Sequence, residues 1–143
     1  MSALPPGYAM TDDPARIDAA AAHAYLTRSY WSPGIPRETV ARAIANSLCV
    51  AVLHAGEQVA MARLVTDRAT MAYLADVYVL EEHRGRGLCK AMLVHLDARP
   101  DLQGLRRWLL FTRDAHSLYA QFGWTALRHP ERAMLRDQPD VYA

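Results

Sequence analysis

The chain has 143 residues, of which 52% are hydrophobic and 22% are charged, and its formal net charge is +1. This length suits one domain with a substantial core, and the composition is that of a globular protein and not of a disordered one. The near-neutral charge argues against nucleic acid or an anionic membrane surface as a partner, because both attract proteins with a large positive field.

The two cysteines, Cys49 and Cys89, have no CxxC spacing, and the histidines show no ligand spacing. We therefore expect neither a disulfide framework nor a metal site. The N-terminal stretch MSALPPGYAM lacks both the basic and the apolar region of a secretory signal, and no run approaches the ~20 apolar residues of a membrane span. These features lead us to expect a cytoplasmic protein that does not enter a membrane.

The first half of the chain predicts two helices followed by a hairpin. The first helix is expected to start near Asp12 or Asp13, and the pattern breaks at Pro33-Gly34 before a second helix begins. The stretch LCVAVLHAGEQVAMARLVTD, residues 48–67, has two apolar runs around a glycine turn, which is typical of a β-hairpin.

The second half predicts alternating strands and helices. In chain order we expect a strand over 70–80, a helix over 87–97, a strand over 105–113, a short helix over 114–123 that Asp114 could cap, and a pair of short strands at 124–127 and 132–137. This order predicts an α/β fold, a mixed central β-sheet flanked by helices, in one domain that spans residues 1–143.

The stretch EEHRGRGLCKAML joins a predicted strand to a predicted helix. Gly85 and Gly87 would let the backbone approach a ligand closely, and the unpaired amides at the start of a helix attract phosphate. Arg84 and Arg86 would add charge-assisted hydrogen bonds. The alternative is that Gly85 only permits a tight turn and that both arginines are solvated. The spacing fits neither G-x-x-x-x-G-K-[ST] nor G-x-G-x-x-G, so neither a nucleoside triphosphate nor NAD is indicated.

Two motifs connect the sequence with a known family. The turn reads Arg84-Gly85-Arg86-Gly87-Leu88-Cys89, which fits the pattern [QR]-x-x-G-x-[GA] except for Cys at the last position. Further on, TRDAHSLYAQFGW fits N-x-x-A-x-x-L-Y-x-x-x-G-[FW], with Thr112 in place of Asn. Over roughly residues 49–127 the chain thus resembles the GCN5-related N-acetyltransferases, the GNAT superfamily, which implies their mixed α/β fold and transfer of an acetyl group to an amine.

The resemblance implies acetyl-CoA as the acyl donor. It assigns the pyrophosphate to the amides of residues 84–90, and the pantetheine arm to the backbone of residues 77–79, where the arm would extend the sheet as an added strand. The residues that we expect to bind this cofactor are Val77, Tyr78, Val79, Arg84, Gly85, Arg86, Gly87, Leu88, Cys89, Lys90, Thr112 and Ala115.

The resemblance also implies the catalytic groups. Tyr119 occupies the position of the family's general acid, whose hydroxyl donates a proton to the leaving thiolate. An alkylammonium acceptor must lose a proton before it attacks, at a cost on the order of 4 kcal/mol at pH 7. Asp76 interrupts an apolar strand, so we expect it to act as a base or as a contact for the amine; the alternative is a structural role at a strand bulge.

The family's acceptor pocket implies a role for the segment between the first two helices. Here this segment offers Arg28, Ser29, Tyr30 and Trp31, which would suit a small apolar or aromatic amine, with Arg28 meeting a substrate carboxylate. The alternative is that Tyr30 and Trp31 only cover the sheet. We therefore expect a small-molecule N-acetyltransferase. A protein or peptide N-acetyltransferase and a non-catalytic acyl-CoA-binding module stay open as alternatives, and so does a homodimer.

Overall fold

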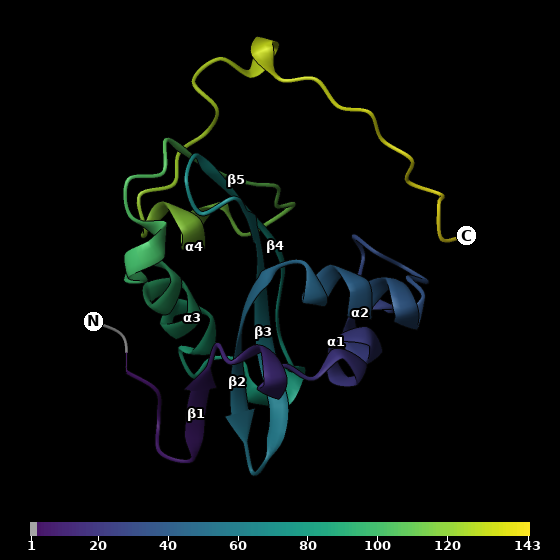
Figure 1. The fold of residues 1–143 in the computed structure, drawn as a ribbon, viewed down its shortest axis with the longest axis vertical. Coiled ribbons are helices and arrows are strands. Elements are labelled where there is room, and N and C mark those ends of the chain that lie inside the picture. The colour runs from purple at the N-terminus through teal and green to yellow at the C-terminus, as the bar shows by residue number, and fades with distance from the viewer. Residues whose placement is uncertain (1–2) are drawn as a thin grey trace.

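The computed structural model describes residues 3–143 and contains one five-stranded sheet in the order β1-β2-β3-β4-β5 (Figure 1). Neighbouring strands are antiparallel except for β4 and β5, which are parallel, so the sheet is mixed as predicted. The strands and helices, in chain order, are β1 (Tyr8–Thr11), α1 (Ala19–Leu26), α2 (Arg37–Ala45), β2 (Leu48–His54), β3 (Glu57–Thr66), β4 (Met71–Val79), α3 (Leu88–Asp97), β5 (Arg107–Leu110) and α4 (His116–Ala120).

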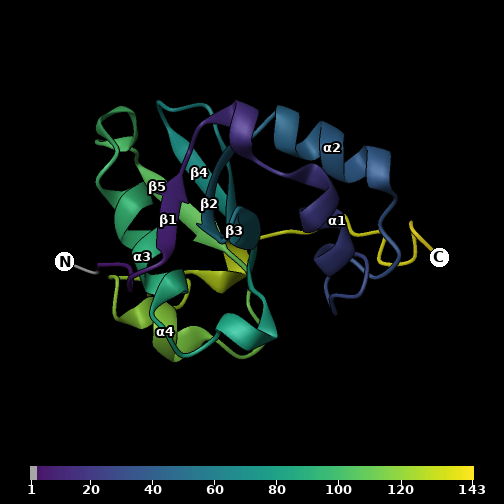
Figure 2. The ribbon, with the colours of Figure 1, turned by 90° about the horizontal axis from the view of Figure 1, so that it is seen from below.

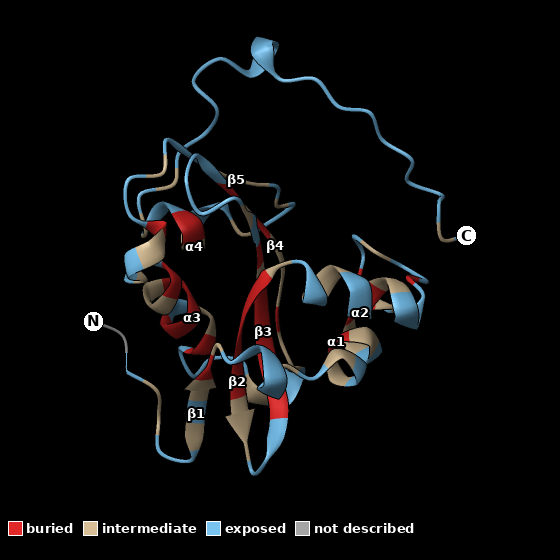
Figure 3. Ribbon diagram, viewed as in Figure 1, coloured by how far each residue is buried: buried red, intermediate tan, exposed pale blue. Residues whose placement is uncertain are grey.

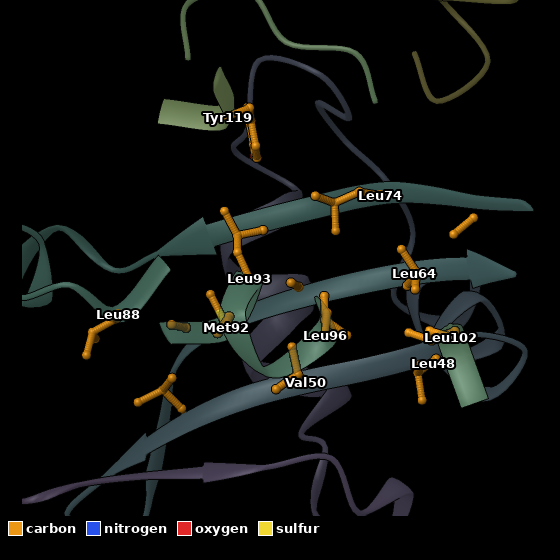
Figure 4. Close-up of a cluster of buried hydrophobic side chains, with 14 of the residues drawn as sticks. Leu48, Val50, Leu64, Leu74, Leu88, Met92, Leu93, Leu96, Leu102 and Tyr119 are labelled. Atoms are coloured by element: carbon orange, nitrogen blue, oxygen red, sulfur yellow. The ribbon is translucent and has the colours of Figure 1, made fainter. Parts of the chain in front are cut away.

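Helices cover both faces of the sheet, with α1 and α2 on one side and α3 and α4 on the other (Figures 1 and 2). The larger core lies beneath α3, whose leucines and methionine recur at helical spacing and pack against alternating strand residues such as Val50 and Leu64 (Figure 4). A smaller apolar cluster, which includes Met61 and Tyr78, lies beneath α1 and α2. Burial on both faces explains why β2 and β3 read as nearly continuous apolar runs.

The sheet opens between β4 and β5. These two strands pair only from Met71 to Leu74 on the β4 side, so the second half of β4, from Ala75 to Val79, has no partner on its β5 side within residues 3–143. A bulge begins at the same place, because two residues of β4 lie opposite one residue of β3 between the pairs Arg63–Ala75 and Met61–Tyr78. Asp76 lies in this bulge with a left-handed φ of 51°.

Several expectations about the elements are wrong. The strand β1 was missed, because its four residues follow a Pro-Pro-Gly stretch that reads as loop. The first helix starts later than expected: Asp13 caps only a short 3₁₀ turn, and Asp18 caps α1 by accepting a hydrogen bond from the Ala21 amide. Asp114 does not cap α4. The pair of strands expected at 124–127 and 132–137 does not form; this part of the chain is irregular apart from a 3₁₀ turn at Pro130–Arg132.

Candidate active site

A cleft of about 970 Å³ lies where β4 and β5 part. Its walls come from the unpaired half of β4, the glycine turn, the first turn of α3, and the connection from β5 into α4. Most residues that the sequence analysis assigned to cofactor and catalysis line this cleft: Asp76, Val77, Tyr78, Val79, Arg84, Gly85, Gly87, Leu88, Cys89, Lys90, Thr112, Ala115 and Tyr119.

The glycine turn presents a row of free backbone donors. Gly85 and Gly87 have φ values of 77° and 78°, a left-handed conformation that favours glycine, and this conformation turns the chain into α3. The amides from Gly85 to Lys90 donate no hydrogen bond to any described residue, and the space above both glycines is open. Unpaired amides at a helix N-terminus fit the pyrophosphate of acetyl-CoA, since they offer donors and the positive end of the helix dipole.

The side chains of the two arginines of the turn are engaged by other residues of the chain. Arg84 donates from Nε to the Val79 carbonyl at 3.0 Å and from Nη2 to the Tyr25 hydroxyl at 2.9 Å. Arg86 donates to the Tyr8 hydroxyl at 3.0 Å and does not line the cleft, so its assignment to the cofactor site stays a prediction. Both side chains brace the turn against neighbouring elements.

Tyr119 lies on α4 at the inner wall of the cleft, and only 8% of it is exposed. Burial raises the pKa of its hydroxyl well above the usual range, and this hydroxyl makes no hydrogen bond with residues 3–143. The neighbouring Cys89 is also affected, because burial raises the pKa of its thiol to about 11. Both groups are therefore protonated at neutral pH. The Thr112 hydroxyl supports the loop before α4 by accepting a hydrogen bond from the Ala115 amide at 3.1 Å.

Asp76 is held on both carboxylate oxygens. Arg63 donates from Nε to Oδ2 at 2.7 Å, and the indole of Trp31 donates to Oδ1 at 2.9 Å. The side chain of Asp76 is 10% exposed, so this ion pair is largely buried. Arg63 is fixed in turn by a hydrogen bond to the Ser47 hydroxyl at 3.1 Å. Both carboxylate oxygens of Asp76 are therefore engaged by residues of the chain itself.

The far end of the cleft is aromatic and is bridged by two loops. The Tyr30 hydroxyl accepts a hydrogen bond from the Arg113 amide at 3.3 Å, and the Arg113 guanidinium lies 3.9 Å from the centre of the Tyr30 ring. Trp31 packs edge-on against Tyr30, and Tyr73 packs edge-on against Phe111. The loop after α1 therefore meets the loop after β5 across this end of the cleft.

Two predicted acceptor residues lie elsewhere. Arg28 forms a bidentate ion pair with Glu81, at 2.7 and 3.0 Å, and does not line the cleft. Ser29 is buried, and its hydroxyl donates to the Leu26 carbonyl and accepts from the Ser32 amide, so it shapes the turn after α1. Neither side chain reaches the aromatic end of the cleft, because each forms hydrogen bonds with a nearer partner.

Sequence reasoning missed several cleft residues, above all Arg63, Tyr73, Phe111 and Arg113. Arg63 carried a signal, since it is a charged residue inside an apolar strand, as Asp76 is. Tyr73 and Phe111 gave no comparable signal, because an aromatic residue in an expected strand reads as core. Arg113 stood out no more than the other arginines of the chain. Within residues 3–143, no group of three or more His, Cys, Asp or Glu side chains is arranged to hold a metal ion. Over the same residues, no helix is long and apolar enough to cross a membrane.

Comparison with known proteins gives a consistent result. The family profile described as "Acetyltransferase (GNAT) domain" matches residues 45–126. A candidate acetyltransferase of Gibberella zeae is 31% identical in an alignment of 137 residues that covers 80% of this chain and 76% of that protein.

Solved structures agree with the profile. A crystal structure of a candidate GNAT-family acetyltransferase from Xanthomonas campestris is 44% identical, covers 99% of both chains and has a TM-score of 0.94. A candidate acetyltransferase of Deinococcus radiodurans, 17% identical, shares the fold with a TM-score of 0.76 over 99% of this chain and 96% of its own. The chain therefore belongs to the GNAT family of N-acetyltransferases.

Proposed function

We propose that the protein transfers an acetyl group from acetyl-CoA to the amine of a small molecule, with Tyr119 as the general acid. One observation carries this proposal: the hydroxyl of Tyr119, a residue that is only 8% exposed, makes no hydrogen bond within residues 3–143 and lies in the same cleft as the free amides of the glycine turn. A site for phosphate and a proton donor thus share one cavity, as direct acyl transfer from a CoA thioester requires.

Acetyl-CoA fits the donor set of this cleft. The amides from Gly85 to Lys90 would hold the pyrophosphate, and the unpaired edge of β4 from Ala75 to Val79 offers backbone groups to the pantetheine arm. The Val79 carbonyl also accepts a hydrogen bond from Nε of Arg84, and it keeps a second lone pair. When bound, acetyl-CoA supplies the thioester whose acyl carbon accepts the amine.

Tyr119 would hold the proton that the departing thiolate needs. The wall that raises the pKa of the Cys89 thiol to about 11 disfavours any thiolate formed beside it, because burial penalises charge. A leaving thiolate in this cleft would therefore take a proton readily, and the Tyr119 hydroxyl has no competing partner among the described residues.

Asp76 would contact and orient the amine. Its oxygens each accept one hydrogen bond, and a carboxylate oxygen can accept a second one from an acceptor amine. The ion pair with Arg63 holds the carboxylate in place for this purpose.

The acceptor end supports a small amine with an apolar or aromatic body. Tyr30, Trp31, Tyr73 and Phe111 supply aromatic walls, and the bridge between Tyr30 and Arg113 narrows this end in a way that does not suit an extended peptide. Arg113, whose nearest carboxylate is that of Asp114 at 3.8 Å, would take the role expected of Arg28 and pair with an anionic group on the acceptor.

The test is Tyr119→Phe, with Tyr142→Phe as the matched control outside the cleft. We expect Tyr119→Phe to lower kcat by about 10²–10⁴-fold while the dissociation constant for acetyl-CoA stays the same, because only the proton donor is removed. Unchanged turnover would remove Tyr119 from the mechanism. The assay uses a panel of small amines and short peptides, and activity on peptides alone would refute the small-molecule acceptor.

A further inference from the structure

The C-terminal arm, residues 125–141, is exposed along its whole length (Figure 3). Met134 is 98% exposed and Leu135 is 71% exposed, although both are large apolar side chains. Every hydrogen bond that the arm makes stays within the arm or the two residues that follow it. Such exposure is unfavourable, since apolar surface gains free energy when it is removed from water.

This arm is anchored at both ends. Before it, Trp124 packs against the main core and lies edge-on to Trp108 and Tyr119. After it, Tyr142 packs against the apolar cluster beneath α1 and α2, with its carbonyl oxygen close above Gly34. Between these anchors the arm arches over the β5 end of the sheet, from the α4 side to the α2 side (Figure 1). The arm is therefore fixed at its two ends, and the segment between them does not pack against the rest of residues 3–143.

An apolar surface on the sheet is also left partly exposed by residues 3–143. Val65, Tyr73 and Leu109 are register partners across β3, β4 and β5, so they form a row on the face that does not pack on α3. Met71 and Phe111 flank this row, and Phe111 is 67% exposed. We call these five residues the open face. The helices α1 and α2 pack on the other end of the same side, over Met61 and Tyr78.

We propose that two copies of the chain associate through these surfaces, with the arm of each copy lying across the open face of the other. One chain carries both an apolar arm and an apolar receiving face, and its own arm does not cover its own face. When a two-fold axis relates the two copies, the arm of each copy covers the open face of the other. No uncovered arm or open face then remains, so the assembly stops at a dimer.

The sequence of the arm supports a paired state. The stretch RAMLRD, residues 132–137, has a pattern that predicts a strand, yet no strand forms there in the single chain. The outer edge of β5 has no partner strand within residues 3–143, and a free edge is a template for pairing with another chain. The alignment with the Xanthomonas campestris crystal structure spans 99% of both chains, so it includes the arm.

The association has a consequence for the acceptor site. Tyr73 and Phe111 belong both to the open face and to the lining of the cleft, so the arm of the second copy would border the acceptor end. This consequence depends on the proposed function, whereas the association itself does not.

The first test is the mass of the full chain in solution, measured by light scattering after size-exclusion chromatography over a range of micromolar concentrations. We expect a dimer for the unmodified protein and monomers for Met134→Glu/Leu135→Glu on the arm and for Val65→Glu on the open face. Each of these variants should weaken the dimer by about a hundredfold or more, because a charge replaces buried apolar surface. Gln138→Glu, which adds the same charge at a polar position of the arm, should remain a dimer.

A second test identifies which chain supplies the arm. Val65→Cys and Met134→Cys proteins are purified separately, mixed, and treated with a short bis-maleimide. We expect a crosslinked species that contains one of each chain, which the unmodified protein does not form. A monomeric unmodified protein, a dimer that persists in both glutamate variants, or crosslinking only within one chain in the Val65→Cys/Met134→Cys double variant would each overturn the proposal. Circular dichroism of every variant shows that it is folded.

Discussion

The buried pair of Arg63 and Asp76 provides the sharpest prediction about the site. Asp76→Asn keeps the left-handed backbone at this position, because Asn tolerates φ of 51° nearly as well as Asp does, and the amide oxygen can still accept from Trp31. The substitution therefore removes little beyond the charge that faces Arg63. Removing one partner of a buried pair costs about 3 kcal/mol, which corresponds to roughly 10 °C in the melting temperature of a chain of this size.

The assay is urea and thermal unfolding of Asp76→Asn, Arg63→Met and the double variant. Both single variants leave one charge uncompensated, so we expect the double variant to recover part of the loss, with a coupling free energy of about 1–3 kcal/mol. Arg28→Ala, which breaks an exposed pair, should leave stability nearly unchanged. The reasoning is refuted if Asp76→Asn unfolds within about 0.5 kcal/mol of the unmodified protein, or if the losses simply add.

Three further predictions follow from backbone conformation and pKa shifts. Gly87→Ala and Gly56→Ala each place a side chain at nearly the same left-handed φ, 78° and 79°, with open space above both. Each variant should therefore lose about 1–2 kcal/mol of stability in urea unfolding, but only Gly87→Ala should weaken acetyl-CoA binding. Equal binding of acetyl-CoA by both variants would contradict the role of the turn. Alkylation of Cys89, followed by mass spectrometry, should be slow at pH 8 and rise about tenfold per pH unit toward the thiol pKa of about 11, so rapid labelling at neutral pH would contradict the burial argument. The hydrogen bond from Arg28 lowers the pKa of Glu81 to about 2 from 4.5, so the pair is complete above pH 4.5 and is lost as the pH falls toward 2. Because both side chains are about half exposed, solvent screens the pair, and the melting temperature of Glu81→Gln should follow that of the unmodified protein closely over this range; a clearly smaller fall for Glu81→Gln would contradict this screening.

Much of the fold follows from local patterns in the sequence. The periodic apolar residues of α3, the hairpin of β2 and β3, and the two glycines between β4 and α3 each depend on nearby residues, and they were predicted correctly. The strand β1 was missed because four residues between loop signals carry little pattern. The strands expected after residue 123 failed for another reason: a strand needs a partner edge, and within the described chain this segment has none.

The candidate site was predictable only where a residue acts through its backbone or its motif. The amides of the glycine turn and the cleft position of Tyr119 follow from the two motifs. The partners of charged side chains do not, because they depend on contacts between distant segments. Arg28 forms an ion pair with Glu81, which lies 53 residues away in the sequence. Asp76 pairs with Arg63 only because the bulge sets the register of β3 against β4. Such pairings need the tertiary structure.

The most direct test of the account is a calorimetric titration of the protein with acetyl-CoA, with free CoA and ATP as comparison ligands. We predict one molecule of acetyl-CoA per chain, with ATP binding much more weakly, because in our proposal the free edge of β4 would pair with the pantetheine arm, which ATP lacks. The same titration of Gly87→Ala should show weaker binding. Failure to bind acetyl-CoA, or equal binding of ATP, would contradict the claim that this cleft was built around the glycine turn to hold an acyl-CoA.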